Sequence, residues 1–210
     1  AMIMIHGDDK GLVLPPKVAP MQVVIVPIYK NDEGKNSVLP KVEEIQNELE
    51  SKDIRVHVDD REGMSPGYKF NDWELKGVPL RIEIGPKDIE NQKIVIAKRY
   101  NLEKVSLSFT EIEKVSEMLD EIQTEMLKKA KEQAKNNTLE ILEYSDFKAK
   151  IEDGGFFNSP WCGKLECEDK IKEETGAEIR VIPFNSEDNT KKCVYCKEPS
   201  VSIPIFARGY

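Results

Sequence analysis

Residues 22–28 read QVVIVPI, and this short apolar run decides how the chain around it must fold. Its β-branched residues favour an extended strand, and its lack of charged residues indicates that both faces of the strand are buried. A strand that is buried on both faces lies inside a sheet that carries helices on each side. We therefore predict an α/β domain built around residues 22–28.

The segments that follow alternate between helical and strand patterns. Apolar residues recur at helical spacing over residues 42–49, after polar residues 31–36, which we expect to form a loop. A second helix is predicted over residues 65–77, between a Ser-Pro start and a glycine stop. Further strands are expected at residues 54–58, 79–85, 93–99 and 105–107. The order β-α-β-α-β-β-β predicts a mixed five-stranded sheet with crossover helices.

A long amphipathic helix is predicted after the sheet. Its apolar stripe consists of Ile112, Val115, Leu119, Ile122, Met126 and Ala130. We interpret this stripe as packing rather than as a groove for a partner, because helix-in-groove motifs are rare. Residues 136–138 break the helix, and a second helical stretch is expected to run towards Ile151. The cysteine-bearing residues beyond it predict a small α+β zinc domain.

The four cysteines form two closely spaced pairs, Cys162-x4-Cys167 and Cys193-x2-Cys196. Zinc takes four soft ligands at tetrahedral corners, and two tight turns that each present two thiolates supply them. The alternatives are two disulfides or four free thiols, but nothing in the sequence signals the secretion that disulfides would suit. With four protein ligands and no position for water, the predicted zinc would be structural.

The charge balance argues against a general binder of polyanions, because the formal net charge is −8. Residues 66–104 hold eight Lys/Arg against six Asp/Glu, a local charge of +2. This excess fits selective contact with nucleic acid, but charge fluctuations of this size are also common. Because these 210 residues contain neither an apolar run long enough to span a bilayer nor a charged-then-apolar leader, we expect a cytoplasmic protein without a membrane partner.

Three parts of the chain resemble one protein family. The stretches are GLVLPPKVAPMQVVIVPI (residues 11–28), SPGYKFNDWELKGVPLRIEIGPKD (residues 65–88), and the WCG…C and CVYC cysteine pairs with the terminal FARGY. Together they resemble the C-terminal half of a prolyl-tRNA synthetase of the archaeal/eukaryotic-like type. The sheet would then be the anticodon-binding domain of a class II synthetase, and the cysteines would belong to the family's zinc-binding C-terminal domain.

This resemblance implies a domain organisation. Residues 1–19 would be the remnant of a catalytic domain and a linker, residues 20–110 the anticodon-binding domain, residues 111–140 a connecting helix, and residues 141–210 the zinc domain. Upstream sequence is expected to be missing. The full enzyme would use ATP and Mg to form prolyl-adenylate and then pass proline to tRNA. Its catalytic motifs would lie upstream, so this chain is expected to hold no catalytic residue and to be inactive alone.

The implied partners are proline tRNA and the catalytic domain of the same enzyme, and the full-length protein would form a homodimer. An alternative is a structural role, in which these domains brace the catalytic domain or the dimer without binding RNA independently. A separate enzyme is a third reading, but no acid/base pair, nucleophile constellation or phosphate-binding loop supports it.

The resemblance also assigns anticodon contacts, in a family that reads guanines at the second and third anticodon positions. A guanine edge offers both acceptors and donors, and an unpaired loop base also needs a stacking surface. Phe70 would stack, Glu74 would accept hydrogen bonds from a guanine, and Arg81, Lys87 and Lys104 would donate them. The alternative is that Phe70 belongs to the core and that the charged residues form a solvated, salt-bridged surface.

The last residue is the remaining candidate. In the family the C-terminal tyrosine, here Tyr210, reaches back so that its carboxylate lies near the active site. An apolar strand expected at residues 201–205 would direct this tail. The alternative is a frayed chain end.

Overall fold

The run at residues 22–28 forms the buried strand that its composition predicts, in a computed structural model that describes residues 2–209. Every residue of β3 (Val23–Pro27) is buried. It pairs in parallel with β4 (Val56–Val58) and with β5 (Leu80–Ile84). The antiparallel strands β6 (Lys93–Lys98) and β7 (Lys104–Ser108) complete the order β4-β3-β5-β6-β7. The predicted mixed five-stranded sheet is confirmed.

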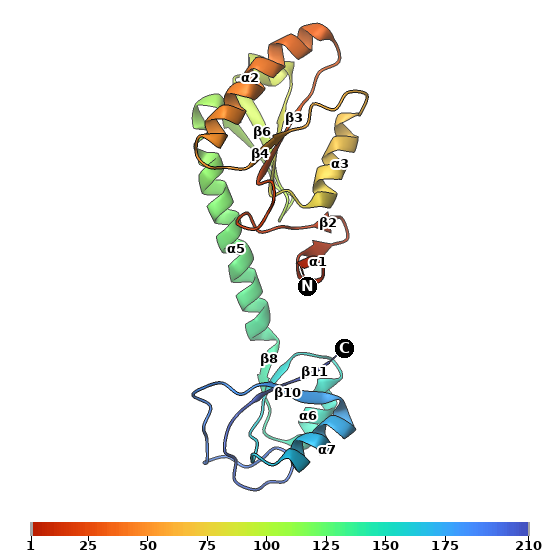
Figure 1. Cartoon of the computed structure of the whole chain (residues 1–210), viewed down its shortest axis with the longest axis vertical. Helices are drawn as coiled ribbons and strands as arrows, with labels where there is room; N and C mark the ends of the chain where they lie inside the picture. The colour runs from red at the N-terminus through yellow and green to blue at the C-terminus, as the bar shows by residue number, and fades with distance from the viewer. Residues whose placement is uncertain (1, 210) are drawn as a thin grey trace. The chain divides into compact units, whose positions relative to one another are not determined.

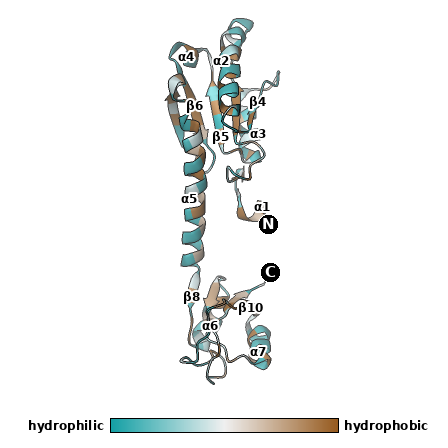
Figure 2. Cartoon of the chain, turned by 60° about the vertical axis from the view of Figure 1, so that its left-hand side comes forward, coloured by the Kyte–Doolittle hydropathy of each residue, from teal (hydrophilic) through white to brown (hydrophobic). Residues whose placement is uncertain are grey.

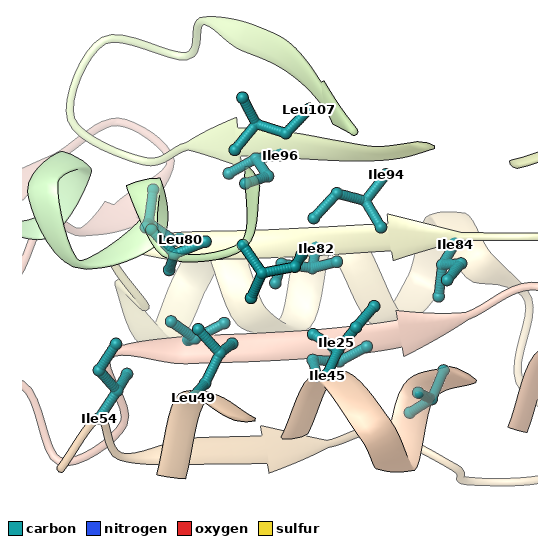
Figure 3. Close-up of a cluster of buried hydrophobic side chains, with 14 of the residues drawn as sticks. Ile25, Ile45, Leu49, Ile54, Leu80, Ile82, Ile84, Ile94, Ile96 and Leu107 are labelled. Carbon is teal, nitrogen blue, oxygen red and sulfur yellow. The ribbon is translucent and has the colours of Figure 1, made fainter. Parts of the chain in front are cut away.

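The crossover helices α2 (Asp32–Glu50) and α3 (Pro66–Lys76) lie on opposite sides of the sheet (Figure 1). The face towards α2 carries the larger core (Figure 3), and the start of α5 (Lys114–Asn136) packs against the same face. The buried residues of this larger core include Ile25, Ile45, Leu49, Leu80, Ile82, Ile94 and Ile96. The face towards α3 carries a smaller cluster of Val24, Val26 and Val78, with Phe70 and Trp73 packed against it.

Residues 32–36 are helical, so the prediction of a loop there is wrong. The side chain of Asn31 caps the helix, because its Oδ1 accepts a hydrogen bond of 2.9 Å from the backbone N–H of Gly34. Asp32 and Glu33 then lie in the first turn, where the helix dipole favours negative charge. The polar residues that resembled a loop are the start signal of the helix.

Helix α3 begins and ends where its residues predict. Ser65 Oγ accepts a hydrogen bond from the Tyr68 N–H, and Gly77 ends the helix in the left-handed conformation, with φ of 74°. A Cβ at Gly77 would lie 2.6 Å from the backbone of Leu12, so glycine is also required by close packing. Leu12 belongs to an N-terminal segment formed by α1 (Met2–Ile5), β1 (Gly7–Asp8) and β2 (Gly11–Leu12).

Helix α5 begins in the first of two compact units, Ala1–Lys128, and ends in the second, Lys129–Tyr210. Short helices precede it, α4 (Pro86–Glu90) after β5 and a 3-10 turn (Phe109–Glu111) after β7. Its stripe packs against the sheet as far as Met126, but Ala130 is exposed. Figure 2 shows the remainder of α5 as largely hydrophilic. Within residues 2–209, no helix has both the length and the apolar composition needed to cross a bilayer.

The second unit contains a four-stranded sheet in the order β10-β11-β9-β8. Its elements are β8 (Thr138–Glu140), α6 (Tyr144–Ile151), β9 (Phe156–Asn158), α7 (Leu165–Thr175), β10 (Ala177–Val181) and β11 (Ile205–Arg208). The ring of Phe147 packs edge to face with those of Phe157 and Phe206, at centroid distances of 5.3 and 5.5 Å. The helix break after residue 136 and the helical stretch ending at Ile151 are as predicted, but the last strand begins at Ile205 rather than at residue 201.

A buried carboxylate ties the end of β4 to helix α3. The side chain of Asp59 is fully buried and accepts hydrogen bonds from Arg61 Nε and Nη2, at 2.8 and 2.7 Å. Trp73 Nε1 donates a third hydrogen bond of 2.8 Å to the same carboxylate. Lys69 Nζ donates to the Asp59 carbonyl at 2.9 Å. Because Lys69 and Trp73 belong to α3, these contacts set the position of the helix that carries Phe70 and Glu74.

Replacing Asp59 by Asn should lower the free energy of unfolding by about 3 kcal/mol at pH 7, because it leaves the buried ammonium of Lys69 without its charge partner. Burial opposes ionisation of Asp59, but the hydrogen bonds from Arg61 and Trp73 and the charge of Lys69 hold its pKa well below the usual range. Because the pKa of Asp59 is lower in the folded state, its ionised carboxylate stabilises the fold at pH values above its unfolded-state pKa of about 3.9. This stabilisation is lost as the pH falls below that value towards the folded-state pKa.

The difference in free energy of unfolding between wild type and Asp59→Asn should therefore decrease below about pH 4. Urea unfolding from pH 7 to pH 3 measures it. Asp60→Asn is the matched control, because Asp60 is the exposed neighbour of Asp59. Equal effects of the two substitutions would contradict this account of Asp59.

Candidate nucleic-acid interface and metal centre

Three of the predicted contact residues meet on the face of the sheet towards α3. Arg81 alternates along β5 with the buried residues Leu80 and Ile82, so its side chain lies on the opposite face from theirs. The strand register places Arg81 opposite Ala97, and Ala97 opposite Lys104. Arg81 and Lys104 therefore lie in one row across β5, β6 and β7, and Phe70 of α3 packs beside them.

The ring of Phe70 is the contact surface for both cations. The guanidinium carbon of Arg81 lies 4.3 Å from the ring centroid, and Lys104 Nζ lies 5.7 Å from it. Arg81 Nη1 also donates to the backbone carbonyl of Phe70 at 3.4 Å. Phe70 is only half-buried and also packs against the small core cluster of this face. Its core role and its place at the candidate site are therefore compatible.

Glu83 is the member of this group that the sequence analysis missed. Its carboxylate accepts hydrogen bonds from Arg81 Nε and Nη2 at 3.1 and 2.9 Å. It also accepts hydrogen bonds from Lys104 Nζ at 3.0 and 2.9 Å. The side chain is only 11% exposed. The signal was present, because Arg81 and Glu83 are two residues apart on one strand and must share a face.

Glu74 and Lys10 lie together beside this group. A hollow of about 200 Å³ is lined by Glu74, Arg81 and Lys104, and also by Lys10 and Leu102. Lys10 Nζ lies 3.5 Å from Glu74 Oε1. The sequence analysis did not select Lys10, because it precedes the sheet by more than ten residues and only the folded chain brings it to α3.

The segment that carries Lys10 is anchored by a buried arginine. Arg99 donates to both carboxylate oxygens of Asp8, at 2.9 and 2.6 Å, and to the backbone carbonyl of Glu74 at 2.9 Å. The hydrogen bond from Arg99 lowers the pKa of Asp8 to about 2. The ion pair therefore persists at neutral pH and keeps Lys10 beside Glu74.

Lys87 is not brought into this group. It lies in the short helix α4, is exposed, and does not line the hollow. Ile89 of the same helix packs against the core on the α2 side of the sheet. Tyr210, the other predicted contact, falls outside the described residues.

The four cysteines converge as their spacing predicts. Their sulfur atoms all lie within 4.8 Å of one another, and Cys162 Sγ is 3.6 Å from both Cys167 Sγ and Cys196 Sγ. In a tetrahedral site with Zn–S distances of about 2.3 Å, the sulfurs are about 3.8 Å apart. A disulfide requires about 2.05 Å, and all four cysteines are free thiols in the described part of the chain. The disulfide alternative is therefore wrong.

Tight turns and one helix present these four sulfurs. Cys162 precedes Gly163, which has φ of 85°, and Cys167 lies in the first turn of α7. The backbone N–H of Lys197 bonds to the Cys193 carbonyl and closes the turn that holds Cys193 and Cys196. Burial raises the pKa of the Cys167 thiol, and a divalent cation among the sulfurs would reverse this direction by stabilising the thiolates. The donor set fits a metal ion.

Comparisons with known proteins cover both units. Residues 22–119 match the family model described as "Anticodon binding domain", and residues 144–210 match the one described as "Prolyl-tRNA synthetase, C-terminal". The chain is 50% identical over 211 residues to a proline–tRNA ligase of Acetoanaerobium sticklandii and 48% identical over 213 residues to one of Cenarchaeum symbiosum. It is 42% identical over 216 residues to the chloroplastic/mitochondrial proline–tRNA ligase of Arabidopsis thaliana.

In each of these three comparisons the whole of this chain is covered. The chain spans 43%, 44% and 40% of the length of these relatives, respectively. Similarity therefore runs through both units, and the two family models follow each other along the chain in the same order as the sheet and the cysteine cluster. The chain comprises an anticodon-binding domain followed by the C-terminal domain of prolyl-tRNA synthetases, and it corresponds to the C-terminal portion of the proline–tRNA ligases that it matches.

Proposed function

We propose that this chain is the tRNA-reading portion of an enzyme that attaches proline to its tRNA with ATP and Mg. The observation that carries the proposal is the hollow lined by Glu74, Arg81 and Lys104 on one face of the anticodon-binding domain. Acidic and basic side chains at one hollow suit a guanine, which presents acceptors at O6 and N7 and donors at N1 and N2.

Each residue then has a role that its surroundings support. Arg81 donates to O6 and N7, Glu74 accepts from N1 and N2, and the exposed part of Phe70 stacks with an unpaired base. Lys104 lies beside Arg81 and donates to the same nucleotide. Lys87, which lies apart on α4, contacts a phosphate rather than a base.

The salt-bridged surface is the competing interpretation of the same residues. Its ion pairs exist, since Glu83 binds both Arg81 and Lys104. One carboxylate does not neutralise two cations, however, and the group of three keeps a net charge of +1. This residual charge favours an anionic ligand such as RNA.

A structural role for the second unit is compatible with RNA reading by the first. In this unit Val181, Ile182 and Phe184 are exposed apolar residues, and Phe184 is fully exposed. They suit a bracing contact with the catalytic domain of the same enzyme, and a homodimer of the full-length protein belongs to the same proposal. Tyr210 would direct its carboxylate towards that catalytic domain. We place the enzyme in the cytoplasm, because a reducing compartment keeps the four cysteines as metal-binding thiolates.

Replacing Arg81 by Ala should weaken binding to proline tRNA and reduce the penalty for changing the guanine that Arg81 reads. The expected loss of discrimination is about ten- to a hundredfold, the value of one good bidentate contact. Filter binding of the chain to tRNAs with one anticodon guanine changed at a time measures it. Glu74→Ala should show the same pattern at its own position.

Lys87→Ala is the matched control, because it removes one positive charge from the same domain. It should weaken binding to all tRNAs alike and make the dependence on salt concentration shallower. If Arg81→Ala also weakens every tRNA equally, Arg81 contacts the backbone and not a base. If neither Arg81→Ala nor Glu74→Ala changes binding, the salt-bridged surface is the correct interpretation.

We further propose that the ion held by the four cysteines is a structural zinc. The support is the set of four thiol ligands, to which no other His, Cys, Asp or Glu of residues 2–209 adds a donor, as is typical of closed zinc sites.

Elemental analysis of the purified chain should give close to one zinc per molecule. Cys193→Ser should lose this zinc together with the order of the second unit, because binding of a structural metal contributes to folding. The edge-to-face packing of Phe147 with Phe157 and Phe206 provides a near-ultraviolet circular dichroism signal for that order. Ser145→Ala, at an exposed position of α6, serves as the control in the same unit. A zinc-free second unit with an intact aromatic signal would contradict the proposal.

A further inference from the structure

We propose that Glu83 is a positioning residue, which orients Arg81 and Lys104 so that they can read an anticodon guanine. This inference rests on the proposed function. Glu83 is itself held firmly, since it lies in β5 between the fully buried residues Ile82 and Ile84 and is buried as a whole residue. A carboxylate fixed to a central part of the sheet is a rigid anchor for longer and more mobile cationic side chains.

The hydrogen bonds of Arg81 leave a defined pair of donors free. A guanidinium has five N–H groups. Nε and one N–H of Nη2 donate to Glu83 Oε1, and one N–H of Nη1 donates to the carbonyl of Phe70. Among the described residues, one N–H therefore remains on each of the two terminal nitrogens. A free N–H on each terminal nitrogen can supply the two donors of a bidentate contact to guanine O6 and N7.

Glu83 also fixes the plane in which these donors lie. The guanidinium is held between the carboxylate and the ring of Phe70, whose centroid is 4.3 Å from the guanidinium carbon. Two contacts from different elements, β5 and α3, restrict rotation about the side-chain bonds of Arg81. A donor pair that is ordered before binding loses less conformational entropy when the base arrives.

Lys104 depends on the same carboxylate. Its side chain is 53% exposed, and both Glu83 oxygens accept from its Nζ. Lys104 Nζ and the Arg81 guanidinium both lie within 6 Å of the Phe70 ring centre. Without the negative charge of Glu83, these two cations beside one ring would repel each other and move apart. Glu83 thus keeps two donors at one place.

Glu83→Gln separates this role from a simple effect of charge. The substitution keeps the size of the side chain but raises the charge of the group from +1 to +2, which by itself should strengthen binding to any RNA. Loss of positioning should instead reduce base discrimination. We expect unchanged or tighter binding to tRNAs with a guanine changed to adenine. We also expect discrimination in favour of unaltered proline tRNA to fall from about ten- to a hundredfold to about threefold or less.

The measurement is filter binding of the 210-residue chain to proline tRNA and to its two single-guanine variants, with thermal unfolding of each protein. Glu113→Gln is the control for charge, because Glu113 is an exposed carboxylate. Glu83→Asp keeps the charge but shortens the reach, and should retain part of the discrimination. In an Arg81→Ala background, Glu83→Gln should cause no further loss of discrimination at the guanine that Arg81 reads.

Three outcomes would overturn the inference. If Glu83→Gln discriminates as well as wild type, Glu83 does not position Arg81, although the proposed function stands. If Glu83→Gln and Glu83→Asp both lower the unfolding temperature and weaken all tRNAs equally, Glu83 is a structural residue only. If the wild-type chain does not distinguish the guanines at all, the proposed function fails and the positioning role fails with it.

Discussion

Burial of β3 on both faces is the constraint on which the first unit depends. Its residues are inaccessible to solvent, so each face must be covered by side chains from a different element. Helix α2 and the start of α5 cover one face with a large aliphatic core. Helix α3 covers the other face with few apolar residues, and its coverage is completed by Phe70 and Trp73. The sheet therefore has one face devoted to stability and another that is partly polar.

The polar face is where the candidate interface lies, and charge pairing organises it. Asp59 holds α3 through buried hydrogen bonds beside the edge strand β4, and Glu83 holds Arg81 and Lys104 on the central strand β5. In both cases a carboxylate with little solvent exposure binds more than one cationic or N–H donor. Such groups are costly to bury unless they are fully paired, so they restrict the conformations that the face can adopt.

The second unit is stabilised in a different way from the first. It has roughly eighty residues and a small core centred on Phe147, Phe157 and Phe206. Small cores supply little net stability, and a metal ion that links several turns compensates for this. Cys193 and Cys196 lie in residues 182–204, which form no helix or strand, and Cys162 lies in the turn before α7. A metal would order this part without requiring further apolar burial.

Local patterns in the sequence determined most elements of the first unit and the group of four cysteines. The five strands of the first sheet, the limits of α3 and the convergence of the four cysteines follow from alternation, capping residues and spacing, which act over a few residues. The loop assigned to residues 32–36 was wrong because a helix cap and a loop share the same polar residues. The family resemblance, and not the local pattern, selected Phe70, Glu74, Arg81, Lys87 and Lys104.

Only the tertiary structure decided which of these residues act together. Lys10 reaches Glu74 because Arg99 and Asp8 anchor a segment distant in sequence. Lys87 lies apart because α4 packs towards the α2 side of the sheet, whereas Glu83 joins the group because strand pairing brings Lys104 to it. The physical reason is that hydrogen bonds and ion pairs depend on distances across the sheet. Those distances are set by register and by helix packing, which the spacing of residues along the chain does not specify.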